Sequence, residues 1–372
     1  MNAPVSVARP SHVEISLATG TLKLDIARAD WPIERLCDFA LRRNPRRAFL
    51  IVSKVLGRHI PARPSEMRAA MRDLAEQAPH DLPGPVLTIG MAETAVALGE
   101  GVHEELARRP GFDGLYLHST RQQLDHPLLC RFEEPHSHAS AHLLYRPASI
   151  DLAAMRTLVL VDDEVSTGTT LANLVAALLA ELPRIEHVVV ASLTDWSGEG
   201  AWLSRIPRPT TRINLLEGQL RWEPSAAPEA LPAGVPPGSL GRMESHTNFG
   251  RLGLADPGAI PLPNLDLPAD TPLRIVGTGE FTYPPFLLAE RLERDDHDVV
   301  VQATSRSPVL LGGAIKSALA FADNYATAVP NFLYNADRTD GRLTVICHET
   351  RLNSVDPALL DALDARALYF GT

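Results

Sequence analysis

Residues 157–170, TLVLVDDEVSTGTT, constrain the fold of this 372-residue chain more than any other stretch. Residues 158–161 are four consecutive apolar residues rich in valine, which is typical of a strand buried on both faces of a parallel sheet. Two carboxylates follow, then small hydroxyl residues around one glycine, and then residues 171–182, which have the spacing and composition of a helix. The stretch therefore predicts a strand, an acidic turn, a Ser/Thr/Gly loop and a helix.

The loop between the acidic turn and the helix has the chemistry of an anion site. At a helix N-terminus, unpaired backbone N–H groups and the helix dipole favour negative charge. The acidic pair, Asp162 and Asp163, instead suits hydroxyl groups or a bound cation. A ribose 5-phosphate carries both a phosphate and a nearby vicinal diol, so it fits the two halves of the motif. The predicted phosphate-binding residues are Ser166, Thr167, Gly168, Thr169 and Thr170.

The string VLVDDEVSTGTT resembles the phosphoribosyl pyrophosphate (PRPP) signature of the type I phosphoribosyltransferases. The resemblance implies an α/β fold in which a parallel sheet carries a small hood over the base. It also implies that the loop holds the 5-phosphate, that the acidic pair holds the ribose hydroxyls, and that Mg²⁺ is bound through PRPP. Asp163 and Arg121 are then the candidate catalytic residues. The alternative is an ordinary strand, turn and helix with polar caps.

A second loop takes its role from the same resemblance. In the family, the loop after the strand expected at 81–90 binds pyrophosphate through backbone N–H groups. Glu93 departs from this pattern, because a carboxylate beside pyrophosphate needs a magnesium ion between them, or must turn away to cap the next helix. The loop residues are Gly90, Met91, Ala92, Glu93 and Thr94.

The hood is expected in the first sixty residues. Residues 31–44 have the pattern of an amphipathic helix, and residues 46–64 that of a strand running into a loop. This strand and loop loosely resemble the part of the family fold that covers the base. Its candidate residues are Ser53, Lys54 and Arg58, with a solvated surface turn as the alternative.

Residues 121–147 are long, polar and poor in periodicity, which is typical of a functional lid. In the family, a loop at this place closes over PRPP and supplies cationic groups. The alternatives are structural histidines and, less well matched by the spacing, a zinc site. The candidates are Arg121, Arg131, His136, His138 and His142.

Composition narrows the class of protein. The net charge of −10 and the pI near 5.7 argue against a nucleic-acid partner. The three cysteines, Cys37, Cys130 and Cys347, have no metal-binding or redox spacing, so a reducing cytoplasm is expected. No apolar run approaches the length that spans a membrane.

The chain length predicts two domains. We place a transferase-like domain with its hood at 20–205 and a Pro/Gly-rich linker and arm at 206–270, with a hairpin expected at 212–223. A second α/β lobe follows at 271–372, and within it residues 312–325 have the pattern of a helix.

The second lobe aligns with the first as a degenerate repeat. HSTR (118–121) lies beside ATSR (303–306), and VDDEV (161–165) beside ICHET (346–350). The spacing from Arg121 to Asp162 equals that from Arg306 to Cys347. Two unrelated βαβ units can share such spacings, so common ancestry is a hypothesis.

Residues 239–372, with the string TSRSP at 304–308, also resemble the TRSP module, which occurs C-terminal to phosphoribosyltransferase domains, often near tellurium-resistance genes. Polar residues beside its turns and strand ends could form a second active site, or could be capping and interface residues. The candidates are Gly279, Glu280, Arg306, His348 and Glu349.

The hypothesis that follows is a Mg²⁺-dependent phosphoribosyltransferase that joins PRPP to a small base-like acceptor and releases pyrophosphate. A PRPP- or nucleotide-sensing binding protein with the same fold is one alternative. Phosphorolytic or pyrophosphorolytic release of a base is another. We expect no nucleic acid or membrane partner, and a homodimer is left open.

Overall fold

A seven-stranded sheet forms the centre of the N-terminal lobe in the computed structural model, which describes residues 11–42, 47–133, 141–147, 150–225, 241–242, 247–265, 267, 270–327 and 329–371. Five of its strands are parallel, in the spatial order β12-β11-β10-β5-β6, and β2 and β1 extend it in antiparallel fashion beyond β12. The strands are β1 (Ser11–Leu17), β2 (Gly20–Ala29), β5 (Val86–Gly90), β6 (Gly114–His118), β10 (Thr157–Val165), β11 (His187–Asp195) and β12 (Thr210–Pro224).

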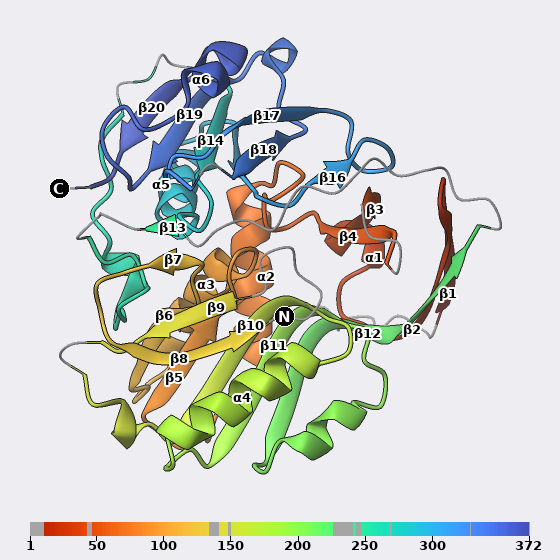
Figure 1. Ribbon diagram of the computed structural model, residues 1–372, viewed down its shortest axis with the longest axis vertical. Coiled ribbons are helices and arrows are strands. Elements are labelled where there is room, and N and C mark those ends of the chain that lie inside the picture. The colour runs from red at the N-terminus through yellow and green to blue at the C-terminus, as the bar shows by residue number, and fades with distance from the viewer. Residues whose placement is uncertain are drawn as a thin grey trace.

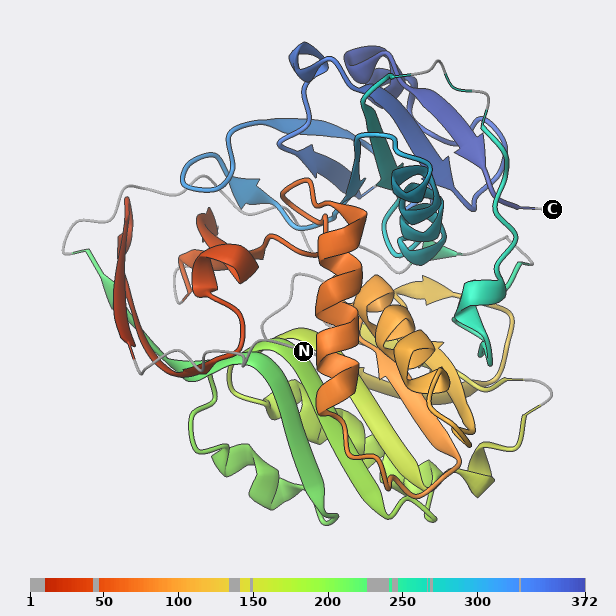
Figure 2. The ribbon, with the colours of Figure 1, turned by 180° about the vertical axis from the view of Figure 1, so that it is seen from behind.

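Helices cover both faces of this sheet. Figures 1 and 2 show α4 (Thr169–Glu181) on one face, and α2 (Pro64–Gln77) and α3 (Val96–Ala107) on the other. The chain winds outward in opposite directions from the neighbouring strands β5 and β10, so their carboxyl ends flank the crevice where open α/β sheets bind ligands. The predicted buried strand at 158–161 is confirmed, since these residues have no exposed surface.

The hood is a small sheet rather than the helix expected at 31–44. Among residues 31–42, the described part of that range, only α1 (Ile33–Leu36) is helical, and β3 (Cys37–Arg42) then pairs with β4 (Phe49–Ser53). The prediction was wrong because Cys37 and Phe39 are buried while Asp38 is exposed, a two-residue alternation that suits a strand. The third strand, β16 (Val309–Leu310), comes from the C-terminal lobe and pairs with β3.

Residues 210–224, which the expected linker at 206–270 includes, form strand β12. Strand β12 is continuous, lying between β11 and β2 with a bulge at Glu217/Gly218, so no hairpin forms at 212–223. Strand β1 likewise lies before the expected domain start at residue 20. The sheet of the first lobe therefore spans Ser11 to Pro224, beyond both ends of the expected range 20–205.

The segment 121–147, expected to be an irregular lid, contains strands in its described part. β7 (Gln122–Gln123) pairs with β13 (Gly241–Arg242), and β8 (Leu128–Glu133) forms a hairpin with β9 (Ala141–Tyr145) that packs against α4. His136 and His138 lie outside the described residues.

The C-terminal lobe is a parallel sheet of four strands in the order β15-β14-β19-β20. This spatial order corresponds to β6-β5-β10-β11 of the first lobe. Along the chain, β14, β15, β19 and β20 follow one another as β5, β6, β10 and β11 do. The lobe contains β14 (Leu273–Gly277), α5 (Tyr283–Arg294), β15 (Val299–Ala303), β17 (Ala318–Ala322), β18 (Pro330–Tyr334), β19 (Leu343–His348), α6 (Pro357–Leu363) and β20 (Arg366–Tyr369). The helix predicted at 312–325 is wrong, because residues there form β17, which pairs with β18.

The two lobes share one apolar core. Helix α2 runs from the first sheet toward the C-terminal lobe, where it contacts α5 (Figure 2). Met67 of α2 and Phe286 of α5 belong to the same buried cluster. Four short 3₁₀ helices complete the described structure: Leu152–Ala154, Ala201–Arg205, Pro257–Ala259 and Arg338–Asp340.

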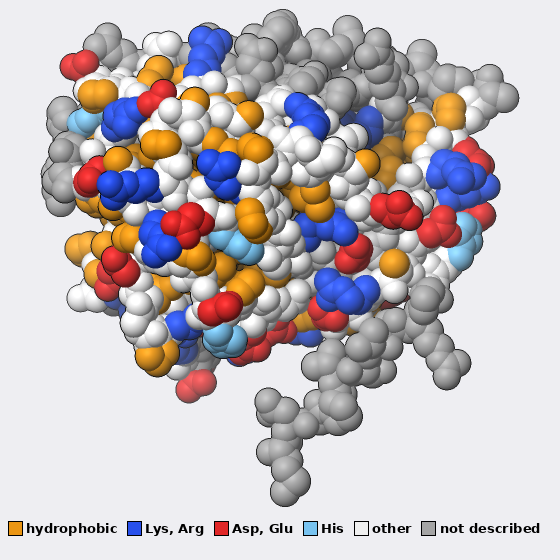
Figure 3. Space-filling view, turned by 90° about the horizontal axis from the view of Figure 1, so that it is seen from below, with side chains coloured by type: hydrophobic (Ala, Val, Ile, Leu, Met, Phe, Trp, Pro, Cys, Tyr) orange, Lys and Arg blue, Asp and Glu red, His pale blue; other side chains and the backbone are white. Residues whose placement is uncertain are grey.

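Charged side chains of both signs lie on the face of the molecule that points away from the C-terminal lobe (Figure 3). Figure 3 shows the face opposite the C-terminal lobe, where the described basic and acidic side chains are interspersed rather than gathered into a basic stripe. Among the described residues, no helix combines the length and the apolar character needed to cross a membrane.

Candidate active site

A cavity of about 240 Å³ lies at the carboxyl ends of β5 and β10. Both lobes and the hood contribute to its wall. Its lining residues are Arg42, Arg47, Leu50, Ile51, Ser53, Arg58, His59, Met91, Ala92, Glu93, Thr94, Arg121, His142, Asp162, Asp163, Glu164, Val165, Ser166, Thr167, Gly168, Thr169, Thr170, Leu171, Ser305, Arg306 and Ser307. The acidic turn, the Ser/Thr/Gly loop and most of the 90–94 loop thus meet at one place.

The Ser/Thr/Gly loop ends where α4 begins. Gly168 is the residue before the helix and has a φ of +66°, and a Cβ atom there would lie 2.1 Å from the Trp202 ring. Only glycine combines that backbone conformation with so close a neighbour. Thr167 Oγ1 accepts a hydrogen bond from the backbone N–H of Thr169 at 3.4 Å, which shapes the turn. The first N–H groups of α4 have no partner within the helix, and Thr169, Thr170 and Leu171 line the cavity.

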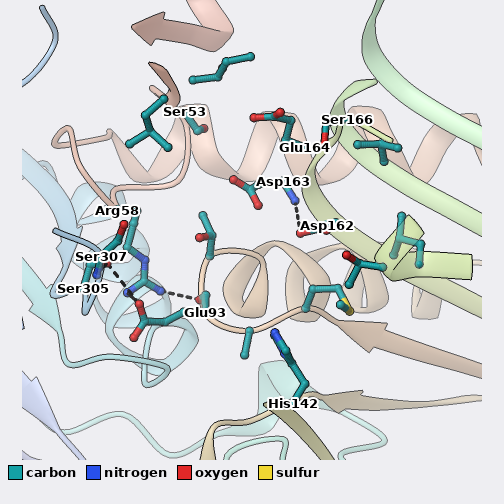
Figure 4. Close-up of a pocket in the computed structure, with 18 of the residues that line it drawn as sticks. Ser53, Arg58, Glu93, His142, Asp162, Asp163, Glu164, Ser166, Ser305 and Ser307 are labelled. Carbon is teal, nitrogen blue, oxygen red and sulfur yellow. Dashed lines mark hydrogen bonds and ion pairs between the residues drawn. The ribbon is translucent and has the colours of Figure 1, made fainter. Parts of the chain in front are cut away.

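The acidic turn lies across from the hood. Asp162 Oδ1 accepts a hydrogen bond from the backbone N–H of Asp163 at 2.9 Å, and both residues are half-buried. The third carboxylate, Glu164, forms an ion pair with Arg47 of the hood. Figure 4 shows Asp162, Asp163, Glu164 and Ser166 on one side of the cavity. This side combines carboxylates, which can accept hydrogen bonds from hydroxyl groups, with a loop at a helix N-terminus, which favours an anion.

The loop after β5 is anchored to β10 and to the residue that follows β6. Met91 N–H donates to the Val161 carbonyl at 2.9 Å, and Ala92 N–H donates to Ser119 Oγ at 2.8 Å. The peptide bond between Ala92 and Glu93 is cis. Gly90 lies behind the cavity wall, where its carbonyl accepts from the Ser119 N–H. Residues 91–94 line the cavity, and Gly90 does not.

Glu93 takes a position that neither sequence interpretation gave it. Its carboxylate faces the C-terminal lobe, where Ser305 Oγ donates at 3.3 Å and the Arg306 N–H at 3.4 Å. Arg58 Nη1 lies 3.9 Å from the same carboxylate. Glu93 therefore joins the loop to the second lobe instead of capping α3.

Of the predicted hood residues, Ser53 and Arg58 line the cavity and Lys54 does not. Lys54 Nζ donates to the Glu34 carbonyl at 2.7 Å. Arg58 is buried, and burial lowers its pKa although Glu93 opposes the shift. Its guanidinium donates to the carbonyls of Glu93 at 2.6 Å and Gly279 at 2.8 Å, so it ties both lobes together.

Arg121, which lies between β6 and β7, and His142, which lies in β9, also line the cavity. His142 Nδ1 is 3.1 Å from Ser119 Oγ, and its Nε2 is 3.4 Å from an Arg121 nitrogen. The backbone N–H of Arg121 donates to Glu280 of the second lobe at 2.7 Å. Arg131, the other arginine proposed for the lid, lies in β8 and does not line the cavity.

The five residues proposed for a second active site do not gather around one cavity in the described structure. Arg306 lines the first cavity instead. Glu280 and Glu349 are buried against Arg251, whose nitrogens lie 3.0 Å from Glu280 and 2.8 Å from Glu349. Burial raises the pKa of Glu280, but Arg251, His118 and the hydrogen bonds from Thr120 and the Arg121 N–H together lower it to about 2.

The remaining two residues have local roles. Gly279 N–H donates to Thr304 Oγ1 at 2.8 Å, and the buried His348 has its Nδ1 3.3 Å from Thr350 Oγ1. Gly279, Glu280, His348 and Glu349 thus make contacts within the fold, and a second active site built from them stays a prediction.

Sequence reasoning missed several cavity residues. Arg42, Arg47 and His59 lie on the hood, and Ser305 and Ser307 lie on the second lobe. The string TSRSP was the available signal, but nothing local showed that it reaches the first lobe. Among the described residues, no group of three or more His, Cys, Asp or Glu side chains is arranged to hold a metal.

Comparison with known proteins gives two family matches. Residues 36–219 match the model described as phosphoribosyl transferase, and residues 265–363 match the TRSP domain found C-terminal to that transferase. No curated protein matches. The two matched segments cover most of the cavity-bearing lobe, without β1 and β2, and most of the C-terminal lobe.

Several solved structures are similar at low identity. Adenine phosphoribosyltransferase from Rhodothermus marinus is 16% identical with a TM-score of 0.33, over 49% of this chain and 95% of that one. The Trypanosoma brucei adenine enzyme, in complex with AMP, pyrophosphate and ribose-5-phosphate, gives 15% and 0.33, over 49% and 78%. Orotate phosphoribosyltransferase from Aeropyrum pernix gives 20% and 0.28, over 48% and 84%.

Proposed function

Because the chain belongs to the phosphoribosyl transferases that carry a C-terminal TRSP domain, we propose that it transfers the 5-phosphoribosyl group of PRPP to a small base-like acceptor and releases pyrophosphate. One observation carries this proposal. The acidic pair Asp162 and Asp163 and the loop 166–170 line the same cavity, at the point where the sheet order reverses. A ligand with a phosphate and a diol a few ångströms apart matches that pairing.

The donor is assigned to three parts of the wall. The N–H groups and hydroxyls of 166–170 hold the 5-phosphate, because a helix N-terminus favours a dianion. The carboxylates of Asp162 and Asp163 accept hydrogen bonds from the ribose hydroxyls. The 91–94 loop receives the pyrophosphate through its backbone.

We expect Mg²⁺ to enter this site bound to the PRPP donor. The acidic pair and the loop hydroxyls offer only oxygen atoms, which is the ligand type that Mg²⁺ prefers. Mg²⁺ bound to the pyrophosphate oxygens of PRPP would neutralise charge on the leaving group. We assign no separate protein site to the ion.

The proposed reaction exchanges two bonds at the ribose C1 carbon. The C1–O bond to pyrophosphate breaks with its electron pair leaving on oxygen, and a C1–N bond forms to the acceptor. Positive charge develops on the ribose, and the carboxylates of Asp162 and Asp163 stabilise it. Asp163 is our candidate base for the acceptor proton, since it lies between Asp162 and the hood residue Ser53 (Figure 4).

The test is pyrophosphate release from PRPP with Mg²⁺ across a panel of nucleobases, for the wild type, Asp162→Asn/Asp163→Asn and Asp361→Asn. Asp361 is an exposed carboxylate on α6, so it serves as a matched control. We expect acceptor-dependent release that the double variant loses and the control keeps. PRPP binding without release for any acceptor would favour the sensor instead, and release that survives the double substitution would overturn the site.

A further inference from the structure

The C-terminal lobe forms one wall of the transfer cavity. Residues 305–307 follow β15, line the cavity, and lead into β16, which pairs with hood strand β3. Figure 4 shows Ser305 and Ser307 beside Arg58 and Glu93, across the cavity from Asp162 and Ser166. The second lobe therefore faces the pyrophosphate loop and lies away from the 5-phosphate loop.

The contacts between the lobes are reciprocal. Glu93 accepts from Ser305 Oγ at 3.3 Å and from the Arg306 N–H at 3.4 Å. In the other direction, Glu280 accepts from Thr120 Oγ1 at 2.5 Å and from the Arg121 N–H at 2.7 Å. Each glutamate is the third residue after its strand, β5 or β14, and each donor pair begins two residues after its strand, β6 or β15.

One contact within each lobe also repeats in the same register. Ala92 N–H donates to Ser119 Oγ at 2.8 Å, and Gly279 N–H donates to Thr304 Oγ1 at 2.8 Å. Across the lobes, Glu93 and Glu280 each accept from the residues that follow the equivalent strand of the other lobe. Such contacts, in which position i meets position j in both directions, define the isologous interface of a two-fold dimer. The second lobe thus occupies the place of a partner subunit, joined within one chain.

The two halves of this pseudo-dimer are not equivalent in function. In the second lobe, Arg251 fills the space beside the equivalent loop and neutralises Glu280 and Glu349. In the first lobe the corresponding space is the open cavity. The second lobe can therefore contribute to the first site without carrying a working site of its own.

Arg306 is the group that such a contribution would use. Both terminal nitrogens of its guanidinium are buried without a hydrogen-bond partner in the described structure, and its side chain is 12% exposed. The nearest carboxylate oxygen, on Asp323, is 3.8 Å away. A buried guanidinium without hydrogen bonds is costly, so the position favours an incoming anion that supplies oxygen acceptors.

We propose that Arg306 binds the pyrophosphate group of the donor, so that the C-terminal lobe completes the transfer site in cis as a built-in partner subunit. Its backbone shares Glu93 with the pyrophosphate loop, which places it at the leaving-group end of the cavity. A guanidinium presents parallel donors that match phosphate oxygens, and in the transition state it would stabilise the charge that accumulates there. This inference rests on the proposed function.

The test compares two probes by calorimetry, each in the presence of Mg²⁺: inorganic pyrophosphate and ribose 5-phosphate. The proteins are the wild type, Arg306→Gln, Arg306→Lys and the control Arg338→Gln, whose side chain is 58% exposed and pairs with Asp364. We expect Arg306→Gln to weaken pyrophosphate binding at least about tenfold, because a charge-assisted hydrogen-bonded pair is lost, and to leave ribose 5-phosphate within about twofold. Lysine should restore part of the loss, since it keeps the charge but not the fork.

The outcomes separate this inference from the proposed function. Unchanged pyrophosphate binding in Arg306→Gln, or an equal loss for both probes in Arg306→Gln and Arg306→Lys, would overturn the role of Arg306. Wild-type binding of ribose 5-phosphate without pyrophosphate would overturn it too, while leaving the phosphate loop intact. Failure of the wild type to bind either probe would overturn both proposals.

Discussion

The complete burial of the Glu100 side chain leads to a prediction about the stability of the protein. It lies on α3, has no exposed surface, and neither carboxylate oxygen has a hydrogen-bond partner in the described structure. Burial raises its pKa well above the usual 4.5, although Arg251 opposes the shift. The carboxyl group is therefore held in its neutral form inside the fold, beside the Arg251 cluster.

The direction of the pH effect follows from that shift. A carboxyl whose folded pKa lies above its unfolded pKa contributes most to stability below the unfolded value, and loses that contribution as pH rises toward the folded value. Each pH unit in this window costs the wild type about 1.4 kcal/mol relative to a residue that does not titrate. Glu100→Gln keeps the shape and removes the titration, so its advantage over the wild type should grow by about 1.4 kcal/mol from pH 5 to pH 6.

The assay is urea unfolding of the wild type and Glu100→Gln at pH 5 and pH 6. Glu76→Gln, on the exposed face of α2, is the matched control and should show no change in the difference between the two pH values. A difference for Glu100→Gln that is independent of pH would refute the reasoning. So would a growing loss of stability in the variant, because it would mean that Glu100 is ionised and paired with Arg251.

Three further predictions concern single substitutions. Gly168→Ala should reduce affinity for ribose 5-phosphate at least about tenfold by calorimetry, while Gly111→Ala, which has a similar positive φ but open space around it, should not. Arg251→Met should cost about 3–5 kcal/mol in urea unfolding, because it leaves two buried carboxylates without a cation, and a cost under 1 kcal/mol would contradict the ion cluster. Burial lowers the pKa of His103 to about 4, below the usual 6.5, so its stabilisation is present above pH 6.5 and declines as pH falls toward 4. Replacing it by Gln should flatten the fall in unfolding free energy between pH 6 and pH 5 by about 1.4 kcal/mol, and an unchanged slope would count against burial in the neutral form.

The parts of the fold predicted from the sequence are those in which local pattern and tertiary position agree. Strand β10, the Gly168 turn and helix α4 follow from residues 157–182 alone, because a doubly buried strand, a left-handed glycine and an apolar helix each leave a local mark. The residues predicted on this stretch and on the 91–94 loop line one cavity. Carboxyl ends of neighbouring parallel strands meet, so this clustering was accessible without coordinates.

Long-range pairing decided the elements that the sequence did not predict. The sequence of β3 has the pattern of an amphipathic helix, but it forms a strand because β4 and β16 pair with it. Strand β12 was not predicted because the proline-rich residues that follow it suggested a linker. Strand propensity depends on neighbours that lie far along the chain, so its local signal is weak. The same limit applied to the site, where Ser305 and Ser307 join residues about two hundred positions away.

The role of Arg251 was equally inaccessible. In the sequence it was one of several basic residues in a proline-rich segment, but in the structure it is buried between Glu280 and Glu349. That contact turns two residues of a presumed second site into parts of an ion cluster. Charge pairs of this kind join segments whose spacing carries no periodic signature.

The most direct test of the central claim is a calorimetric titration of PRPP with Mg²⁺ into the wild type and into Asp162→Asn/Asp163→Asn. The cavity that holds the acidic pair and the phosphate loop predicts saturable binding at one site per chain in the wild type, and at least about tenfold weaker binding in the double variant, since it loses the charge-assisted bonds to the ribose hydroxyls. Absence of wild-type binding, or equal affinity in the two proteins, would contradict the assignment of residues 162–170 to PRPP.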